Sequence, residues 1–131
     1  MAQSGIVSDA PRVALGLIRL INGSAALIRP DLVAGQMSSA PPAPGIRYVL
    51  RMFGIRTVFL GLDLLGGNED QRRSALQRAP IIHAVDASAA ILAGLGRQLP
   101  ARRAVLLVGI SGLNLALALV ARRAAVEAHA R

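Results

Sequence analysis

Six ionisable or amide side chains stand inside otherwise apolar stretches of this chain. They are Arg19, Arg56, Asp63, His83, Asp86 and Asn114. A charge at the centre of a bilayer costs about 2.5–3.5 kcal/mol on insertion scales, so such residues are functional candidates in any membrane helix. Their chemistry would be a proton or ion relay, or the binding of an anionic head group or substrate. The two arginines also balance the two aspartates, so a structural ion-pair network is the competing interpretation.

Residue patterns for catalysis or metal binding are sparse around these positions. His83 and Asp86 are three residues apart and would suit an Asp-oriented base, but Ser88 lies on a different helix face. Neither a G-x-S-x-G nor an H-E-x-x-H motif is present. One buried histidine with two aspartates gives too few metal ligands, and the chain has no cysteine. We therefore expect no enzymatic activity, no cofactor and no metal.

Four apolar segments must position these side chains, and they cover approximately residues 13–29, 47–66, 80–97 and 103–121. The last contains an uninterrupted apolar run of the ~18 residues that mark a transmembrane candidate. The others become long enough if arginines at their ends extend to the interface. The prolines lie between the segments or at their edges, as expected for helices. The sequence predicts an all-α, four-helix transmembrane bundle, with residues 1–131 forming a single integral membrane domain.

The connections between these segments differ in character. Residues 30–45 read as a long irregular loop, residues 68–80 as a polar loop and residues 97–103 as a tight turn. A soluble helical bundle is the alternative, but each of its helices should then carry one polar face. Residues 104–121 are apolar all round apart from Ser111 and Asn114. A cleaved signal peptide is disfavoured by Asp9 before the first segment and Arg19 within it.

The charge distribution supports a membrane location. The net charge is +8, and all 15 basic residues are arginines, most of which flank apolar segments rather than forming one stripe. This placement is typical of membrane proteins and argues against nucleic-acid binding. The Lys-free composition, rich in Ala, Gly and Arg, suggests a high-GC bacterial genome. Four spans place both termini on one side, and the positive-inside rule predicts cytoplasmic termini in a bacterial inner membrane.

Helix geometry groups the polar residues. Rises of about 1.5 Å per residue place them in the same half of the bilayer. Arg56 and Asp63 share a helix face, but Asp86 has a more suitable height to pair with Arg56, and His83 lies one turn from Asp86. Arg51 is expected to extend to the opposite interface.

Small residues share the faces that carry two of these charges. Gly16 and Gly23 flank Arg19, while Ala90 and Gly94 continue the line of Asp86. Small residues let transmembrane helices approach closely, so these charged faces are also predicted to be packing faces.

The segments "RMFGIRTVFLGLDLL" and "APIIHAVDASAAI" resemble small four-span actinobacterial membrane proteins that are distantly similar to DoxX-type proteins. The matched residues are Arg51, Gly54, Arg56, Asp86 and Ala87. Many such proteins carry an acidic residue after the second arginine, where this chain has Thr57. The departure makes Asp86 or Asp63 the expected partner of Arg56. The resemblance implies a fold and a location but no settled activity.

Two functions follow as hypotheses. The first is a non-enzymatic accessory or interaction component that contacts the lipid bilayer and another membrane protein or a second copy of itself. The second is a small oligomeric transporter, or a protein that binds lipid or anions, with a proton or ion relay.

Overall fold

The chain folds into α-helices. The computed structural model describes the backbone of residues 2–130 and the side chains of residues 9–130. The helices are α1 (Ala2–Ile28), α2 (Pro30–Met37), α3 (Pro44–Gly66), α4 (Glu69–Leu95) and α5 (Ala101–His129). No strand occurs in the described residues. The all-α prediction is therefore confirmed, with a short fifth helix in addition to the four long ones.

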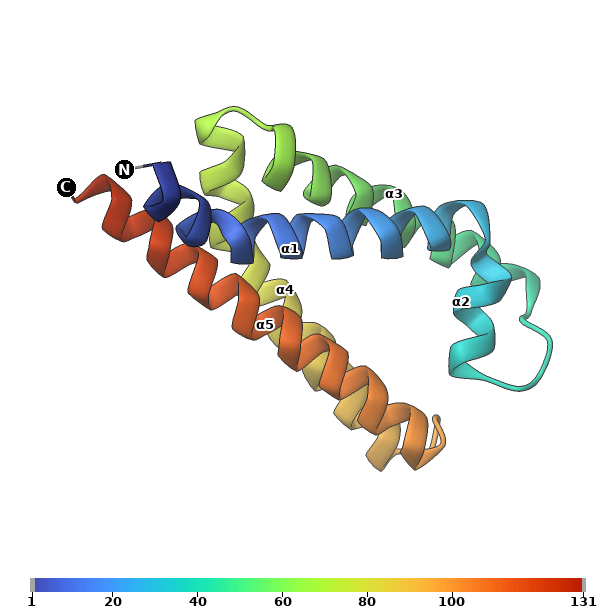
Figure 1. The fold of residues 1–131 in the computed structure, drawn as a ribbon. Helices are drawn as coiled ribbons and strands as arrows, with labels where there is room; N and C mark the ends of the chain where they lie inside the picture. Colours follow the sequence, from blue (N-terminus) through green and yellow to red (C-terminus); the bar gives the residue numbers. More distant parts are fainter. Residues whose placement is uncertain (1, 131) are drawn as a thin grey trace.

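The four long helices form two antiparallel pairs. Helix α1 packs along α3, and α4 packs along α5, with most inter-helix contacts falling within these pairs (Figure 1). The pairs meet at the end of the molecule that carries both termini and the α3–α4 connection, and diverge towards the other end (Figure 1). Helix α2 lies beyond the far end of α1, and Asp31 there pairs with Arg47 of α3 at 2.7 Å.

Glycines bring α1 and α3 into backbone contact. A Cβ atom added at Gly54 would lie 2.6 Å from the backbone nitrogen of Leu27 and 2.7 Å from the carbonyl oxygen of Gly23. A second crossing lies seven residues later in α3 and seven residues earlier in α1, where a Cβ at Gly61 would lie 3.0 Å from the carbonyl oxygen of Gly16. Seven residues are about two helical turns, so both glycines of each helix occupy one face. This close approach matches the small-residue packing expected for membrane helices.

The main apolar core lies where the two helix pairs meet. It is built from all four long helices, and small alanines allow them to converge. Its buried members are Leu15, Leu64, Ala75, Leu76, Ala79, Ala118 and Ala121. The same region holds the buried polar side chains described below, so the junction of the pairs is the part of the molecule that positions the candidate site.

Two predicted loops are wrong. Residues 30–37 of the expected irregular loop form α2, which starts with Pro30 at a position where a missing N–H is tolerated. Most of the expected polar loop at 68–80 is helical, because α4 begins at Glu69. Its start is a capping box: the Gln71 N–H donates to Asn68 Oδ1 at 2.9 Å, and the Asn68 N–H donates to Gln71 Oε1 at 2.8 Å.

Two prolines lie inside helices rather than between them. Pro80 is buried within α4, and Pro11 lies within α1. A proline removes one i→i−4 hydrogen bond and usually kinks or ends a helix, which is why the sequence suggested a boundary at each. In α4 the apolar residues on either side of Pro80 pack in the bundle. Their burial, with the capping box, offsets the lost hydrogen bond.

Three of the helices are long and apolar enough to cross a membrane, namely Asp9–Ile28 in α1, α4 and α5. Helix α3 has a similar length but carries Arg47, Arg51, Arg56 and Asp63. Large apolar side chains face outward from every long helix. Examples are Ile21 (68% exposed), Phe59 (60%), Leu92 (68%) and Val105 (71%). An outward apolar surface of this extent is consistent with a membrane protein.

Candidate functional site

A buried polar cluster, defined here as Arg19, His83 and Asp86, lies between α1 and α4. One terminal nitrogen of Arg19, Nη2, lies 2.7 Å from His83 Nε2 and 3.0 Å from Nδ1. His83 Nδ1 lies 3.9 Å from Asp86 Oδ2. The side chain of His83 is 1% exposed, whereas that of Asp86 is 39% exposed. The cluster therefore runs from a buried guanidinium, through a buried imidazole, to a carboxylate that is partly accessible.

The helices fix these three side chains through packing. Arg19 lies between Gly16 and Gly23, whose contact with α3 holds α1 in place. His83 follows Pro80 by one turn, on a buried part of α4. His83 and Asp86 are three residues apart, so the same helix face presents both. Arg19 of α1 thus reaches His83 of α4, while Gly16 and Gly23 beside it contact α3. Gly94 of the predicted α4 line contacts Ala104 of α5.

The hydrogen-bonding pattern leaves the cluster incompletely satisfied. A guanidinium only donates, so its bond to His83 requires an unprotonated ring nitrogen as acceptor. The Nε atom of Arg19 is buried without a hydrogen-bond partner. Asp86 is close enough to interact electrostatically with Arg19. Unsatisfied buried donors are uncommon in folded proteins, so Arg19 Nε marks a place where an acceptor would bind favourably.

The structure brings together only some of the residues proposed from the sequence. Asn114 of α5 is 7% exposed and lies in the buried part of the bundle. Arg56 is exposed, and Asp63 is half-buried. Neither forms an ion pair with any side chain in residues 9–130. The expected Arg56–Asp86 pair is thus replaced by Arg19 beside His83 and Asp86.

The orientation of α3 explains the position of Arg56. The face that meets α1 carries Gly54, Thr57 and Gly61, all of which are buried. Arg56 follows Gly54 by two residues, about 200° around the helix, so it points away from α1. Thr57 needs no partner on another helix, because its hydroxyl donates to the Phe53 carbonyl oxygen at 2.9 Å. Thr57 is therefore a packing residue.

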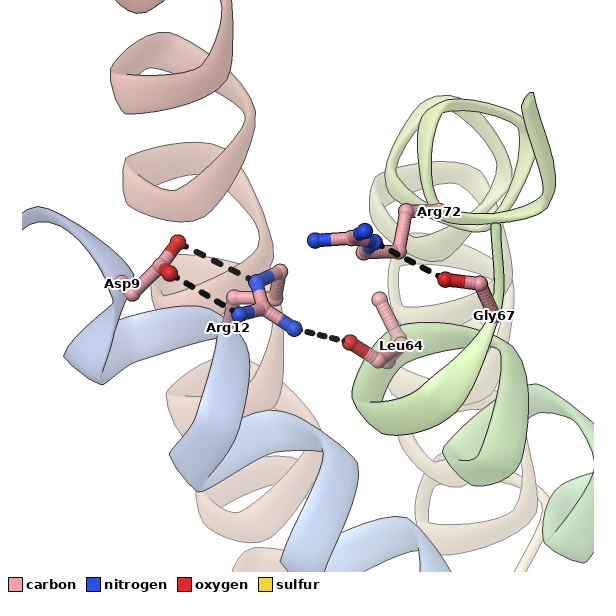
Figure 2. Close-up of polar contacts among 5 residues, drawn as sticks. All are labelled: Asp9, Arg12, Leu64, Gly67 and Arg72. Atoms are coloured by element: carbon pink, nitrogen blue, oxygen red, sulfur yellow. Dashed lines mark hydrogen bonds and ion pairs between the residues drawn. The ribbon is translucent and has the colours of Figure 1, made fainter. Parts of the chain in front are cut away.

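A second group of arginines, which the sequence analysis did not single out, gathers at the end of α3. Arg12 donates to both carboxylate oxygens of Asp9, at 3.2 and 3.0 Å, and to the Leu64 carbonyl oxygen (Figure 2). Arg72 donates to the Gly67 carbonyl oxygen at 3.0 Å. Cations near a helix C-terminus interact favourably with its exposed carbonyls. The signal in the sequence was that Arg12 and Arg72 both lie at the predicted cytoplasmic end.

The chemistry open to the buried cluster is proton or ion transfer, anion binding, or structural pairing. Within the described residues, no group of three His, Cys, Asp or Glu side chains is arranged to hold a metal ion. Comparisons with protein-family models, with curated proteins and with solved structures found no match to this chain.

Proposed function

We propose that this protein is a four-span integral membrane protein of a bacterial inner membrane, with cytoplasmic termini, that acts as a non-enzymatic accessory or interaction component. The proposal rests on where the side chains lie: every long helix directs large apolar side chains outward, while polar side chains are buried between the helices. Three helices have the length and hydropathy of membrane spans. Helix α3 completes the fourth span by burying its glycine face on α1 and extending Arg47 and Arg51 towards the interface.

The divergence of the two helix pairs favours an interaction role. Away from the terminal end, the α4–α5 pair carries large exposed side chains, including Leu92, Leu95 and Val105. Helices in a membrane associate through close packing of small residues and apolar faces. Both helix pairs present such apolar faces, against which another membrane protein or a second copy of the chain can pack.

Affinity purification of the full chain in a mild detergent tests this proposal. We expect the protein in the membrane fraction, with one membrane protein or a second copy co-purifying in fixed stoichiometry. The control is the same purification from cells that express an unrelated tagged membrane protein. Recovery of the chain in the cytosolic fraction would contradict the membrane assignment, and recovery as a partner-free monomer would contradict the interaction role.

A proton or ion relay is the second candidate, and the gradient of exposure along the polar cluster favours it. Asp86 is partly accessible, while His83 and Arg19 are buried behind it. A titratable chain of this form can pass a proton between an accessible and a buried site.

Transport across proteoliposomes tests the relay. We expect Asp86→Asn and His83→Gln each to reduce proton-coupled flux, measured per amount of folded protein in the vesicles, at least about tenfold, since both changes remove titration but keep side-chain size. Arg56→Gln is the control, because Arg56 lies outside the cluster and is exposed. Equal flux from all four proteins, wild type included, would exclude the relay.

A further inference from the structure

The end of the bundle that carries the termini contains a basic cavity formed by α1, α4 and α5. Its volume is about 430 Å³, which is large enough for a phosphate with a glycerol-sized attachment. Four arginines and two acids line it, together with apolar side chains of α4 and α5. The charged residues are Asp9, Arg12, Glu69, Arg72, Arg73 and Arg122, and the apolar ones include Leu76 and Val126.

The acids in this cavity are already engaged. Asp9 accepts two hydrogen bonds from Arg12, and Glu69 Oε1 lies 3.4 Å from His129 Nε2. Within residues 9–130, no acidic side chain lies at ion-pair distance from Arg72, Arg73 or Arg122. The four arginines outnumber the two acids, so the cavity has a net positive charge that the protein only partly neutralises.

Backbone carbonyls hold two of the arginines in place. The carbonyls of Leu64 and Gly67, at the end of α3, orient Arg12 and Arg72, and Figure 2 shows the two guanidinium groups directed into the same space between α1 and α4. The repulsion between the two guanidinium groups is only partly offset by Asp9, which interacts electrostatically with both arginines. Arginines fixed in this way present several N–H donors to one position, an arrangement that matches the oxygens of a phosphate.

We propose that this cavity binds an anionic phosphate group, carried either by a phospholipid head group or by a small soluble phosphate ester. Arg73 and Arg122 add their positive charge to that of Arg12 and Arg72 around the phosphate. Leu76 and Val126 contact the apolar part of the ligand. Arg12 directly precedes the first apolar segment and Arg122 directly follows the last, so the cavity lies at the level of lipid head groups. Binding of a phospholipid head group depends on the membrane assignment proposed above, whereas binding of a soluble phosphate ester does not.

Native mass spectrometry of the full chain in mild detergent tests the site. The lipid probes are phosphatidylglycerol and phosphatidylcholine with identical acyl chains, and the soluble probes are inorganic phosphate and glycerol phosphate. The site variant is Arg73→Gln/Arg122→Gln. The matched control is Arg78→Gln/Arg123→Gln, which removes the same charge from the same two helices outside the cavity.

We expect the site variant to weaken binding of the preferred phosphate probe at least about tenfold, since two charge-assisted hydrogen bonds are lost, while the control changes it less than about threefold. Preference for phosphatidylglycerol over phosphatidylcholine identifies a lipid ligand, and binding of glycerol phosphate identifies a soluble one. Equal losses in the site and control variants would show attraction to overall charge and would overturn the proposal. Failure of the wild type to bind any anionic probe would also overturn it.

A variant that binds the probe more tightly provides a further test, because misfolding would weaken binding rather than strengthen it. Glu69 lines the cavity and repels a bound anion, so Glu69→Gln is expected to tighten binding of the same probe about two- to fivefold. Asp70→Gln is the control, because Asp70 is exposed on the same first turn and does not line the cavity. Equal or weaker binding by Glu69→Gln would count against the site. Cytosolic recovery of the protein would exclude the lipid source but leave binding of a soluble phosphate ester intact.

Discussion

Gly54→Ala is expected to destabilise the protein by about 1–3 kcal/mol, although alanine is the better helix former. The added Cβ would lie 2.6 Å from the Leu27 backbone nitrogen. No side-chain rotation relieves a contact with backbone, so α1 and α3 must separate along the crossing. Thermal unfolding in detergent, followed by circular dichroism, measures the loss. The bulkier Gly54→Leu should prevent recovery of a monodisperse protein.

Gly112→Ala supplies the control, and its expected effect has the opposite sign. Gly112 lies in α5, and a Cβ there would have no heavy atom within 4 Å apart from its chain neighbours and the backbone of its own helix. Helix propensity then acts alone and favours alanine by up to about 1 kcal/mol. Equal changes in stability at the two positions would contradict the close α1–α3 packing.

Asp86→Ala is expected to lower the free energy of unfolding by about 2–3 kcal/mol, because it leaves Arg19 buried without a nearby acid. The cost is below that of a fully buried pair, since the Asp86 side chain is 39% exposed. The double variant Arg19→Met/Asp86→Ala should recover most of the loss. Chemical unfolding of both single variants and the double variant should give a coupling energy of about 1–3 kcal/mol.

The parallel cycle with Arg56 distinguishes the two possible partners of Asp86. Arg56 is exposed on α3, so Arg56→Met combined with Asp86→Ala should be additive within about 0.5 kcal/mol. Strong coupling to Arg56 with none to Arg19 would restore the pairing predicted from the sequence. The two cycles share the Asp86→Ala variant, so its own cost enters both equally.

Hydrophobic patterning located the long helices well but placed some of their ends incorrectly. The apolar segments at 47–66 and 103–121, and residues 13–28 of the first, lie in long helices, because their interiors contain no proline. Helix α4 begins eleven residues before the expected start at residue 80. Pro80 suggested a boundary, whereas the Asn68–Gln71 capping box and the apolar residues between them and Pro80 extend the helix.

Composition and residue spacing did not predict which face of each helix meets its neighbours at the site. Arg19 and His83 meet, as the similar depths estimated along their helices suggest. Depth alone does not determine which side of a helix faces a neighbour, so Arg56 was assigned to the same cluster. Gly54 and Gly61 carry that information, because a line of glycines with heptad spacing identifies the face that touches another backbone. The basic cavity depends on three helices converging, which no single segment encodes.

The concentration of contacts within the α1–α3 and α4–α5 pairs has a consequence for biogenesis. The backbone contact of α1 with α3, at Gly23 and Gly54, belongs entirely to the first half of the chain. A nascent chain that has been synthesised as far as Gly67 already contains both of its surfaces. In an integral membrane protein of the kind proposed above, the first hairpin can therefore pack before the second hairpin is synthesised. Burial of Arg19 is completed only when α4 delivers His83 and Asp86.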